Sequence, residues 1–379
     1  MSPSRLHALA TAGTSTWLDY IDRGLLDSGA LADRIRDEAL AGMTSNPSIF
    51  EKALEGPAYD DAIRAAGVEQ GPRALFEQLA TRDVRDACDQ FLGVYRDTDG
   101  VDGYVSIEVS PDLANDAAGT VEEARRLWAT IDRPNVMIKV PGTVAGAQAV
   151  RTLIAEGLNV NVTLLFAVEA HARVIEAYLA GLEERAAAGL PLKPVASVAS
   201  FFVSRVDSEV DKRIDARMVA APDAARRERL AALKGAAAIA NARLAYALFL
   251  REFSGPRWAA LRDQGARVQR PLWASTSTKN PSYRDVMYVE LLAGPHTVNT
   301  MPPATLDAFR DHGESADTLS GTAASAGATI AALRREGIEM DEVTEKLLTE
   351  GLAAFVKSFE TLLAGLARKV AATPVGAGR

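Results

Sequence analysis

Lys139 stands out because it interrupts an apolar run, Val136-Met137-Ile138-Lys139-Val140-Pro141. The period of two along a β-strand places Lys139 on the face of Met137, just before the expected end of the strand. Withdrawal from water there favours the neutral amine, which is the form that adds to carbonyl groups. The competing interpretation is a strand-end lysine that extends its ammonium group into solvent.

Four further polar residues alternate with apolar ones along other expected strands: Asp19, Glu108, Asn161 and Thr163. Burying a carboxylate among apolar neighbours is costly unless it has a partner, so the positions of Asp19 and Glu108 need an explanation. Asp19 has a plainer interpretation as a cap or turn residue, and Glu108 as a structural partner of a lysine. Asn161 and Thr163 have one as hydrogen-bonded core residues.

Short β-rich runs alternate with longer segments of helical period, which is typical of βα units around a parallel sheet. Eight strands are expected, at residues 16–20, 41–45, 104–109, 136–140, 158–163, 195–200, 271–275 and 296–300. Thr143 and Gly157 fit the start and end of one intervening helix. Eight units predict an α/β fold, a (β/α)₈ TIM barrel with additional helices.

The extra length is helical. A barrel of this type usually has about 250 residues, whereas this chain has 379. Helical insertions are expected near 51–95 and 211–252, and a C-terminal helix near 340–370. No linker composition divides the chain, so residues 1–379 are predicted to form one barrel domain.

A barrel fold would bring these scattered polar residues together. The carboxyl ends of all eight strands meet at one face, where barrel enzymes place their active sites. A lysine, two carboxylates, an amide and a hydroxyl are therefore expected to gather in one cavity.

Composition excludes several other classes of function. The 42 Lys and Arg residues against 50 Asp and Glu residues give a net charge of −8, which argues against a nucleic-acid binder. A single cysteine excludes an intramolecular disulfide framework and fits a reducing cytoplasm. Metal-ligand and nucleotide-binding motifs are missing, so no metal or cofactor is expected, and no membrane-spanning segment or secretory signal is recognisable.

Six segments, in their order and spacing, resemble the transaldolase family, class I Schiff-base enzymes of the pentose phosphate pathway. They are Trp17-Leu18-Asp19, Thr44-Ser45-Asn46-Pro47-Ser48-Ile49-Phe50, Ser106-Ile107-Glu108-Val109, Ile138-Lys139-Val140-Pro141-Gly142-Thr143, Asn161-Val162-Thr163-Leu164-Leu165-Phe166 and Ser200-Phe201-Phe202-Val203-Ser204-Arg205. The resemblance covers most of the chain and is greatest to the longer bacterial members. It implies a (β/α)₈ barrel acting on small sugar phosphates, without a cofactor, nucleic acid or membrane as partner.

The resemblance also assigns roles. Lys139 would form the Schiff base, Asp19 would be the acid and base of carbon–carbon cleavage, and Glu108 would act with Thr163 through a water. The implied substrate-binding residues are Asn46 and Asn161 for sugar hydroxyls, Ser200 and Arg205 along the sugar-phosphate channel, and Phe202, Ser275 and Lys279 in the neighbouring segments.

Two of these phosphate contacts have alternatives. Many members carry an arginine after the seventh strand, whereas Ser275-Thr276-Ser277-Thr278-Lys279-Asn280 offers Lys279. Arg205 has a second interpretation as a surface residue paired with Asp207 or Glu209.

Two other functions fit the same residues. One is an aldolase of the fructose-6-phosphate type, which would release free dihydroxyacetone. Glu108 favours transfer over this alternative, because the related aldolases usually lack a carboxylate there. The other is a catalytically silent barrel that serves as a scaffold. Cys88 is interpreted as a structural residue, and for His296 a structural role and a catalytic one both stay open.

Overall fold

Eight parallel strands close into one barrel in chain order, with β8 pairing with β1. The computed structural model describes residues 4–66 and 71–372. The strands are β1 (Thr14–Asp19), β2 (Leu40–Thr44), β3 (Tyr104–Glu108), β4 (Val136–Pro141), β5 (Val160–Leu165), β6 (Ser197–Phe202), β7 (Arg270–Ala274) and β8 (Thr297–Met301). The predicted α/β fold, a (β/α)₈ barrel with additional helices, is confirmed.

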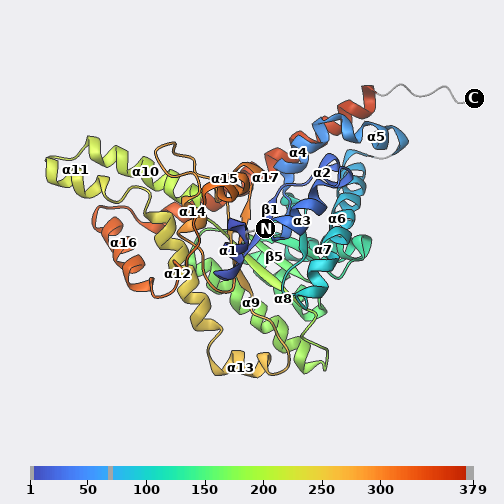
Figure 1. The fold of residues 1–379 in the computed structure, drawn as a ribbon, viewed down its shortest axis with the longest axis horizontal. Helices are drawn as coiled ribbons and strands as arrows, with labels where there is room; N and C mark the ends of the chain where they lie inside the picture. The colour runs from blue at the N-terminus through green and yellow to red at the C-terminus, as the bar shows by residue number, and fades with distance from the viewer. Residues whose placement is uncertain (1–3, 67–70, 373–379) are drawn as a thin grey trace, which may run out of the picture.

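Helices surround the barrel and extend beyond it on both sides (Figure 1). The first nine are α1 (Arg5–Thr11), α2 (Arg23–Asp27), α3 (Ala30–Asp37), α4 (Pro47–Glu55), α5 (Asp60–Ala66), α6 (Pro72–Asp97), α7 (Ala117–Ile131), α8 (Val144–Glu156) and α9 (Val168–Ala187). They are followed by α10 (Ser204–Val219), α11 (Ala224–Ala231), α12 (Ala237–Glu252), α13 (Pro256–Arg262), α14 (Met287–Glu290), α15 (Pro303–His312), α16 (Ala323–Arg335) and α17 (Met340–Ala372). Short 3₁₀ turns η1 (Pro57–Tyr59) and η2 (Pro111–Leu113) complete the set.

Strands β5 and β6 each begin two residues later than the apolar pattern predicts. The Asn159 amide explains the start of β5, because it donates to the carbonyl oxygens of Pro134 and Val136 at 2.9 and 3.1 Å and accepts from the Ala196 N–H at 2.9 Å. Asn159 thus joins three chain segments at the amino-terminal end of the barrel instead of pairing within a strand.

The expected helix boundaries at Thr143 and Gly157 are confirmed. The Thr143 hydroxyl accepts a hydrogen bond from the Gly146 N–H at 2.9 Å and so caps α8. At the other end Gly157 adopts a φ of 96°, the left-handed conformation that glycine tolerates best.

The long C-terminal helix α17 crosses the carboxyl-terminal face of the barrel. It contacts α4, α6 and η2 on one side of the barrel mouth and α10 on the other, and it also reaches β5. Figure 1 shows its last turns beside α4 and α5, while α10 and α11 project on the opposite side of the molecule. Helices α4 to α6 occupy the region of the insertion expected near 51–95, in which residues 67–70 lie outside the described part of the chain.

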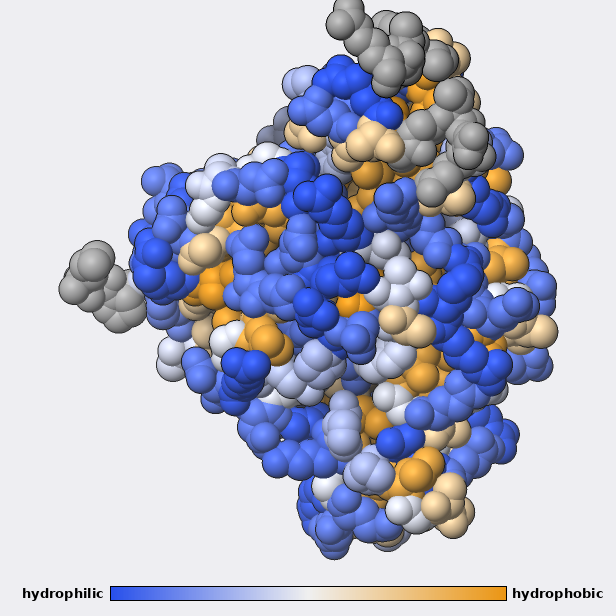
Figure 2. All heavy atoms as spheres, turned by 90° about the vertical axis from the view of Figure 1, so that its right-hand side faces the viewer, coloured by the Kyte–Doolittle hydropathy of each residue, from blue (hydrophilic) through white to orange (hydrophobic). Residues whose placement is uncertain are grey.

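Apolar side chains fill the layer between the strands and the helices, among them Ile107, Ile138 and Val162, which are at most 3% exposed. Figure 2, which views the side that carries α6 and α7, shows mostly hydrophilic residues with small separate hydrophobic patches. None of the described helices has the length and hydropathy required to cross a membrane.

Candidate active site

Strand register brings three polar side chains to one level of the barrel. Glu108 on β3 pairs with Lys139 on β4, and Lys139 pairs with Asn161 on β5. On the other side of the mouth, Asp19 at the end of β1 pairs with Thr44 on β2. Asp19, Thr44 and Glu108 are the last residues of their strands, and the stagger of the barrel brings Lys139 and Asn161 to the level of Glu108. The pairing therefore places these side chains toward the face where barrel enzymes hold substrate.

A cavity of about 670 Å³ opens at this face, and we call it the mouth cavity. It is lined by eight of the residues predicted from the sequence: Asp19, Asn46, Lys139, Ser200, Phe202, Arg205, Ser275 and Lys279. They come from elements spread between β1 and the loop after β7, and only closure of the barrel brings them together.

Lys139 lies at the base of the mouth cavity and is 4% exposed. Its Nζ donates to the backbone oxygen of Ser45 at 3.1 Å and lies 3.6 Å from Oε2 of Glu108. The amine is therefore enclosed and held in place, rather than extended into solvent.

Glu108 is buried beside Lys139, with 3% of its side chain exposed. Neither carboxylate oxygen has a hydrogen-bond partner among the described residues. Burial raises the pKa of Glu108 to about 7, although the charge of Lys139 acts in the opposite direction. A carboxyl group with such a pKa exchanges protons readily near neutral pH.

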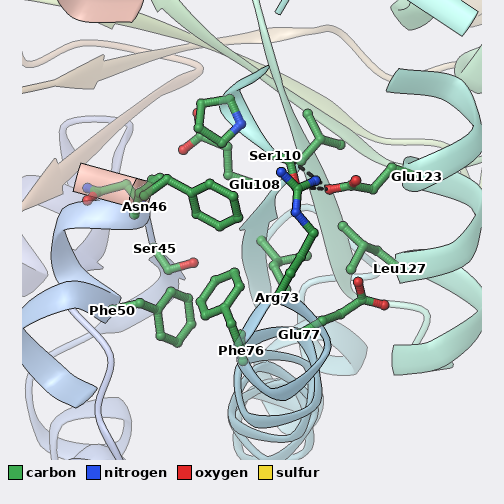
Figure 3. Close-up of a pocket in the computed structure, with 16 residues that line it drawn as sticks. Ser45, Asn46, Phe50, Arg73, Phe76, Glu77, Glu108, Ser110, Glu123 and Leu127 are labelled. Carbon is green, nitrogen blue, oxygen red and sulfur yellow. Dashed lines mark hydrogen bonds between the residues drawn. The ribbon is translucent and has the colours of Figure 1, made fainter. Parts of the chain in front are cut away.

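Glu108 lines a second cavity instead of the mouth cavity. This side pocket lies between the start of α4, the facing sides of α6 and α7, and the end of β3, and α17 contributes Phe359 to it. Figure 3 shows Phe50 and Phe76 on one side of the pocket, and Arg73 reaching from α6 toward Ser110 and Glu123. Asn46 borders both cavities. The expectation of a single cavity is thus replaced by two neighbouring ones.

Asp19 faces the mouth cavity and is hydrogen-bonded to β2. The Thr44 hydroxyl donates to Oδ1 of Asp19 at 2.7 Å and lies 2.7 Å from the Thr300 hydroxyl. Burial raises the pKa of Asp19, whereas Lys139 and the Thr44 hydrogen bond lower it. The helix cap in this segment is Asp22, which accepts from the Leu25 N–H, so Asp19 is not the capping residue.

Asn161 and Thr163 are fully buried on β5 and differ in their contacts. Asn161 donates to the Ser106 hydroxyl at 3.0 Å and accepts from the Ser200 hydroxyl at 2.6 Å. The Thr163 hydroxyl has no hydrogen-bond partner within the described residues. Thr163 therefore retains a free polar group, as Glu108 does.

Arg205 lies in the first turn of α10 at the rim of the mouth cavity, and its guanidinium lies 5.5 Å from the centre of the Phe202 ring. The alternative pairing is absent: Asp207 accepts from the Ala238 N–H and the Tyr288 hydroxyl, and Glu209 pairs with Arg213 and Lys346. Burial lowers the pKa of Arg205. None of the ion pairs found in residues 4–66 and 71–372 involves Arg205.

Lys279 reaches the same rim from the loop after β7. Its Nζ donates to the Ser277 hydroxyl at 2.7 Å. Partial withdrawal from water and then the positive charge of Arg205 lower the pKa of Lys279. Two cations that repel one another at a cavity rim favour an anion between them.

The backbone of Ser275 directs this loop over the mouth. Its φ of 56° lies in the left-handed region, which is uncommon for a residue with a side chain. The Ser204 N–H donates to the Ser275 carbonyl at 3.1 Å, which fastens the loop to the start of α10. Farther along, the Tyr283 hydroxyl donates to Asp211 on α10 at 2.6 Å. Helix α10 therefore supports both Arg205 and the loop that carries Lys279.

Several lining residues of the mouth cavity were not predicted. They are Thr44, Ser48, Ala274, Ser277, Thr300, Pro302 and Phe355. Ser48 follows Asn46 within one of the matching segments, and its hydroxyl lies 2.8 Å from that of Ser358 on α17. Phe355 also belongs to α17, and nothing in its local pattern distinguishes it from an ordinary apolar residue of an amphipathic helix.

Cys88 and His296 lie away from the mouth cavity. Cys88 is fully buried on α6, and burial raises the pKa of its thiol. His296 precedes β8 at the amino-terminal end of the barrel.

A closed (β/α)₈ barrel with an enclosed lysine and two buried carboxylates at its carboxyl-terminal face defines a barrel enzyme. A family model described as "Transaldolase/Fructose-6-phosphate aldolase" matches residues 16–366, and the chain belongs to this family.

Curated relatives match over almost their whole length. A protein named "Transaldolase" from Thermobifida fusca (strain YX) is 50% identical over 376 residues, which cover 97% of this chain and 99% of the relative. Proteins of the same name from Trichodesmium erythraeum (strain IMS101) and Mycolicibacterium smegmatis (strain ATCC 700084 / mc(2)155) are 45% and 48% identical. The match to the Trichodesmium protein covers 98% of this chain and 98% of the relative. The match to the Mycolicibacterium protein covers 94% of this chain and 95% of the relative.

Proposed function

We propose that this protein is a transaldolase that uses Lys139 as its Schiff-base residue. It transfers a dihydroxyacetone unit from sedoheptulose 7-phosphate to glyceraldehyde 3-phosphate, which gives erythrose 4-phosphate and fructose 6-phosphate. The observation that carries the proposal is the enclosed Lys139 amine, 3.6 Å from a Glu108 carboxylate that has no hydrogen-bond partner among the described residues. The names of the full-length relatives support the same reaction.

The reaction begins when the Lys139 amine adds to the ketose carbonyl and forms a carbinolamine. Glu108, acting with Thr163 through a water, protonates the departing oxygen, and the products are water and a protonated imine. That imine accepts electrons from the neighbouring carbon–carbon bond. Asp19 takes the proton of the C4 hydroxyl, the C3–C4 bond breaks, and the aldose phosphate leaves. A three-carbon enamine stays on Lys139, and an acceptor aldose phosphate reverses these steps.

Polar residues around Lys139 orient the sugar. The Asn46 Oδ1 atom accepts from the Ile49 N–H at 3.0 Å, which leaves the amide nitrogen of this cavity-lining residue to donate to substrate hydroxyls. Asn161 and Ser200, already hydrogen-bonded to each other, present a fixed polar edge. Arg205 and Lys279 bind the phosphate, and Phe202 and Ser275 line the path between the two ends of the substrate. We place this activity in the cytoplasm, since one buried thiol suits a reducing compartment.

The family description includes a second activity, fructose-6-phosphate aldolase, which would release free dihydroxyacetone. Incubation of fructose 6-phosphate with and without erythrose 4-phosphate distinguishes the two. A transaldolase forms sedoheptulose 7-phosphate only with the acceptor and releases little dihydroxyacetone. Steady release of dihydroxyacetone without an acceptor identifies the aldolase, and the absence of any turnover or lysine adduct supports a silent barrel.

A further inference from the structure

The inner end of the side pocket is lined by Glu108. Its inner wall is formed by Ser45, Asn46 and Glu108, and its outer part opens between α6 and α7 beside Arg73, whose side chain is 50% exposed. The Lys139 amine touches this inner wall, because it donates to the Ser45 carbonyl and pairs with Glu108. The amine thus lies between the mouth cavity and the side pocket.

The side pocket is narrow. Although its total volume is about 480 Å³, this includes open solvent, and the enclosed part has room for little more than one water molecule. Aromatic rings narrow it: Phe76 packs edge to face against Phe50 at 5.5 Å and against Phe359 at 5.6 Å between ring centres.

Polar groups extend from the opening toward Glu108 along one side of the pocket (Figure 3). Arg73 donates to the Ser110 hydroxyl at 3.4 Å, and the Ser110 hydroxyl and N–H both donate to Glu123 at 2.7 Å. Ser110 follows Glu108 by two residues. A buried water needs polar partners, and in this largely apolar pocket the two unpartnered Glu108 oxygens, together with Ser110 and Glu123, are the acceptors on this side.

The proposed reaction requires such a route. One water is formed when the carbinolamine C–O bond breaks and Glu108 gives up its proton. One water is consumed when Glu108 takes a proton from water and the oxygen bonds to the imine carbon. The resulting carbinolamine then loses its hydroxyl proton to the nitrogen, the C=O bond forms and the C–N bond to Lys139 breaks. Throughout these steps the sugar occupies the mouth cavity, and Phe355 of α17 forms part of its lining.

We propose that the side pocket is the passage by which water leaves and reaches the imine carbon through Glu108, while the sugar phosphate occupies the mouth cavity. The inference rests on the proposed function and adds a second entrance to the same site. Substrate and water then use different openings, and Glu108 separates them.

Filling the side pocket tests the passage. Ala80 on α6 lines the pocket and is 1% exposed, so Ala80→Leu narrows it, and Ala80→Val narrows it less. Leu127→Phe narrows it from α7 and serves if the Ala80 variants do not fold. Ala74→Leu is the matched control, because Ala74 is an exposed residue of α6 outside the side pocket.

The measurement is exchange of the C2 carbonyl oxygen of fructose 6-phosphate with ¹⁸O-labelled water, followed by mass spectrometry. In the filled variants we expect exchange to slow about tenfold or more, a change in barrier of about 1.4 kcal/mol, with KM unchanged. Borohydride should trap the same final amount of adduct in these variants, but the adduct should accumulate more slowly. The final amount is unchanged because a narrowed passage slows imine formation and imine hydrolysis equally.

Two results have different meanings. Wild-type exchange rates in folded variants with a filled side pocket overturn the passage and leave the transaldolase proposal intact. If the unmodified protein shows neither trapped adduct nor exchange above the rate in buffer, the proposed function fails, and the passage fails with it.

Discussion

The Nζ atom of Lys139 lies 3.6 Å from the Oε2 atom of Glu108, at paired positions of the neighbouring strands β4 and β3. The distance is too long for a strong hydrogen bond and short enough for a strong electrostatic interaction. The charge of Lys139 therefore acts on Glu108 without a short hydrogen bond that would fix the carboxyl group. This arrangement suits a pair in which the amine attacks a carbonyl and the carboxyl group then protonates the departing oxygen.

Glu108→Gln tests whether the Glu108 carboxyl group protonates the departing oxygen. The pKa of Glu108 is about 7, so the fraction of the protonated form, which the dehydration step requires, decreases as the pH rises through 7. We expect the rate of adduct formation in the unmodified protein to decline above that pH. Glu108→Gln should be slower throughout and should lack this inflection, as measured by borohydride trapping across pH 5.5 to 9. An unchanged inflection in the variant would assign it to another group.

Asp19→Asn separates imine formation from bond cleavage. The amide cannot accept the C4 hydroxyl proton, so the adduct should still form while release of the aldose phosphate is lost. Trapping of donor sugar followed by mass analysis should find the intact ketose on the enzyme. Thr44→Val, which removes the hydroxyl that donates to Asp19, is the milder companion and should slow cleavage less. Failure of Asp19→Asn to trap any sugar would move Asp19 to an earlier step.

Arg205→Ala tests whether Arg205 binds the phosphate group of the substrate. Loss of a charged hydrogen bond costs about 1.5–3 kcal/mol, so KM for phosphorylated substrates should rise about tenfold to a hundredfold. Donors without phosphate should be almost unaffected, and steady-state kinetics on both kinds of donor make the comparison. Equal losses on both would indicate a structural arginine. An effect confined to Lys279→Ala would place the phosphate at the loop after β7.

His171 predicts a pH dependence of stability. It is fully buried on α9, neither ring nitrogen has a hydrogen-bond partner among the described residues, and burial lowers its pKa from 6.5 to about 4. Between these values the unfolded chain binds the proton and the folded protein does not, so stability falls as the pH falls. From pH 7 to pH 5 the loss attributable to His171 is about 2 kcal/mol.

Urea unfolding of the wild type and of His171→Leu at the two pH values measures this contribution by difference. We expect the free energy of unfolding of the wild type, relative to that of His171→Leu, to fall between pH 7 and pH 5. A difference between the two proteins that is the same at both pH values would contradict a neutral His171 in the folded protein.

Much of the fold and of the candidate site follows from local patterns. A polar residue such as Lys139 within an apolar strand is conspicuous, and the barrel brings the carboxyl ends of all the strands together. Residues that reach the site over a long chain separation leave no such signal. Phe355 arrives on α17, and the side pocket is enclosed by α4, α6 and α7, whose mutual packing no local pattern specifies. The position of Glu108 on the side pocket instead of the mouth cavity depends on that packing.

Peptide mapping after borohydride reduction with fructose 6-phosphate tests the assignment of Lys139 most directly. We expect the mass of the reduced sugar on the peptide that contains Lys139, and we expect Lys139→Ala to retain its fold but to lose both the adduct and turnover. An adduct on another lysine such as Lys279, or substantial turnover by Lys139→Ala, would contradict the assignment.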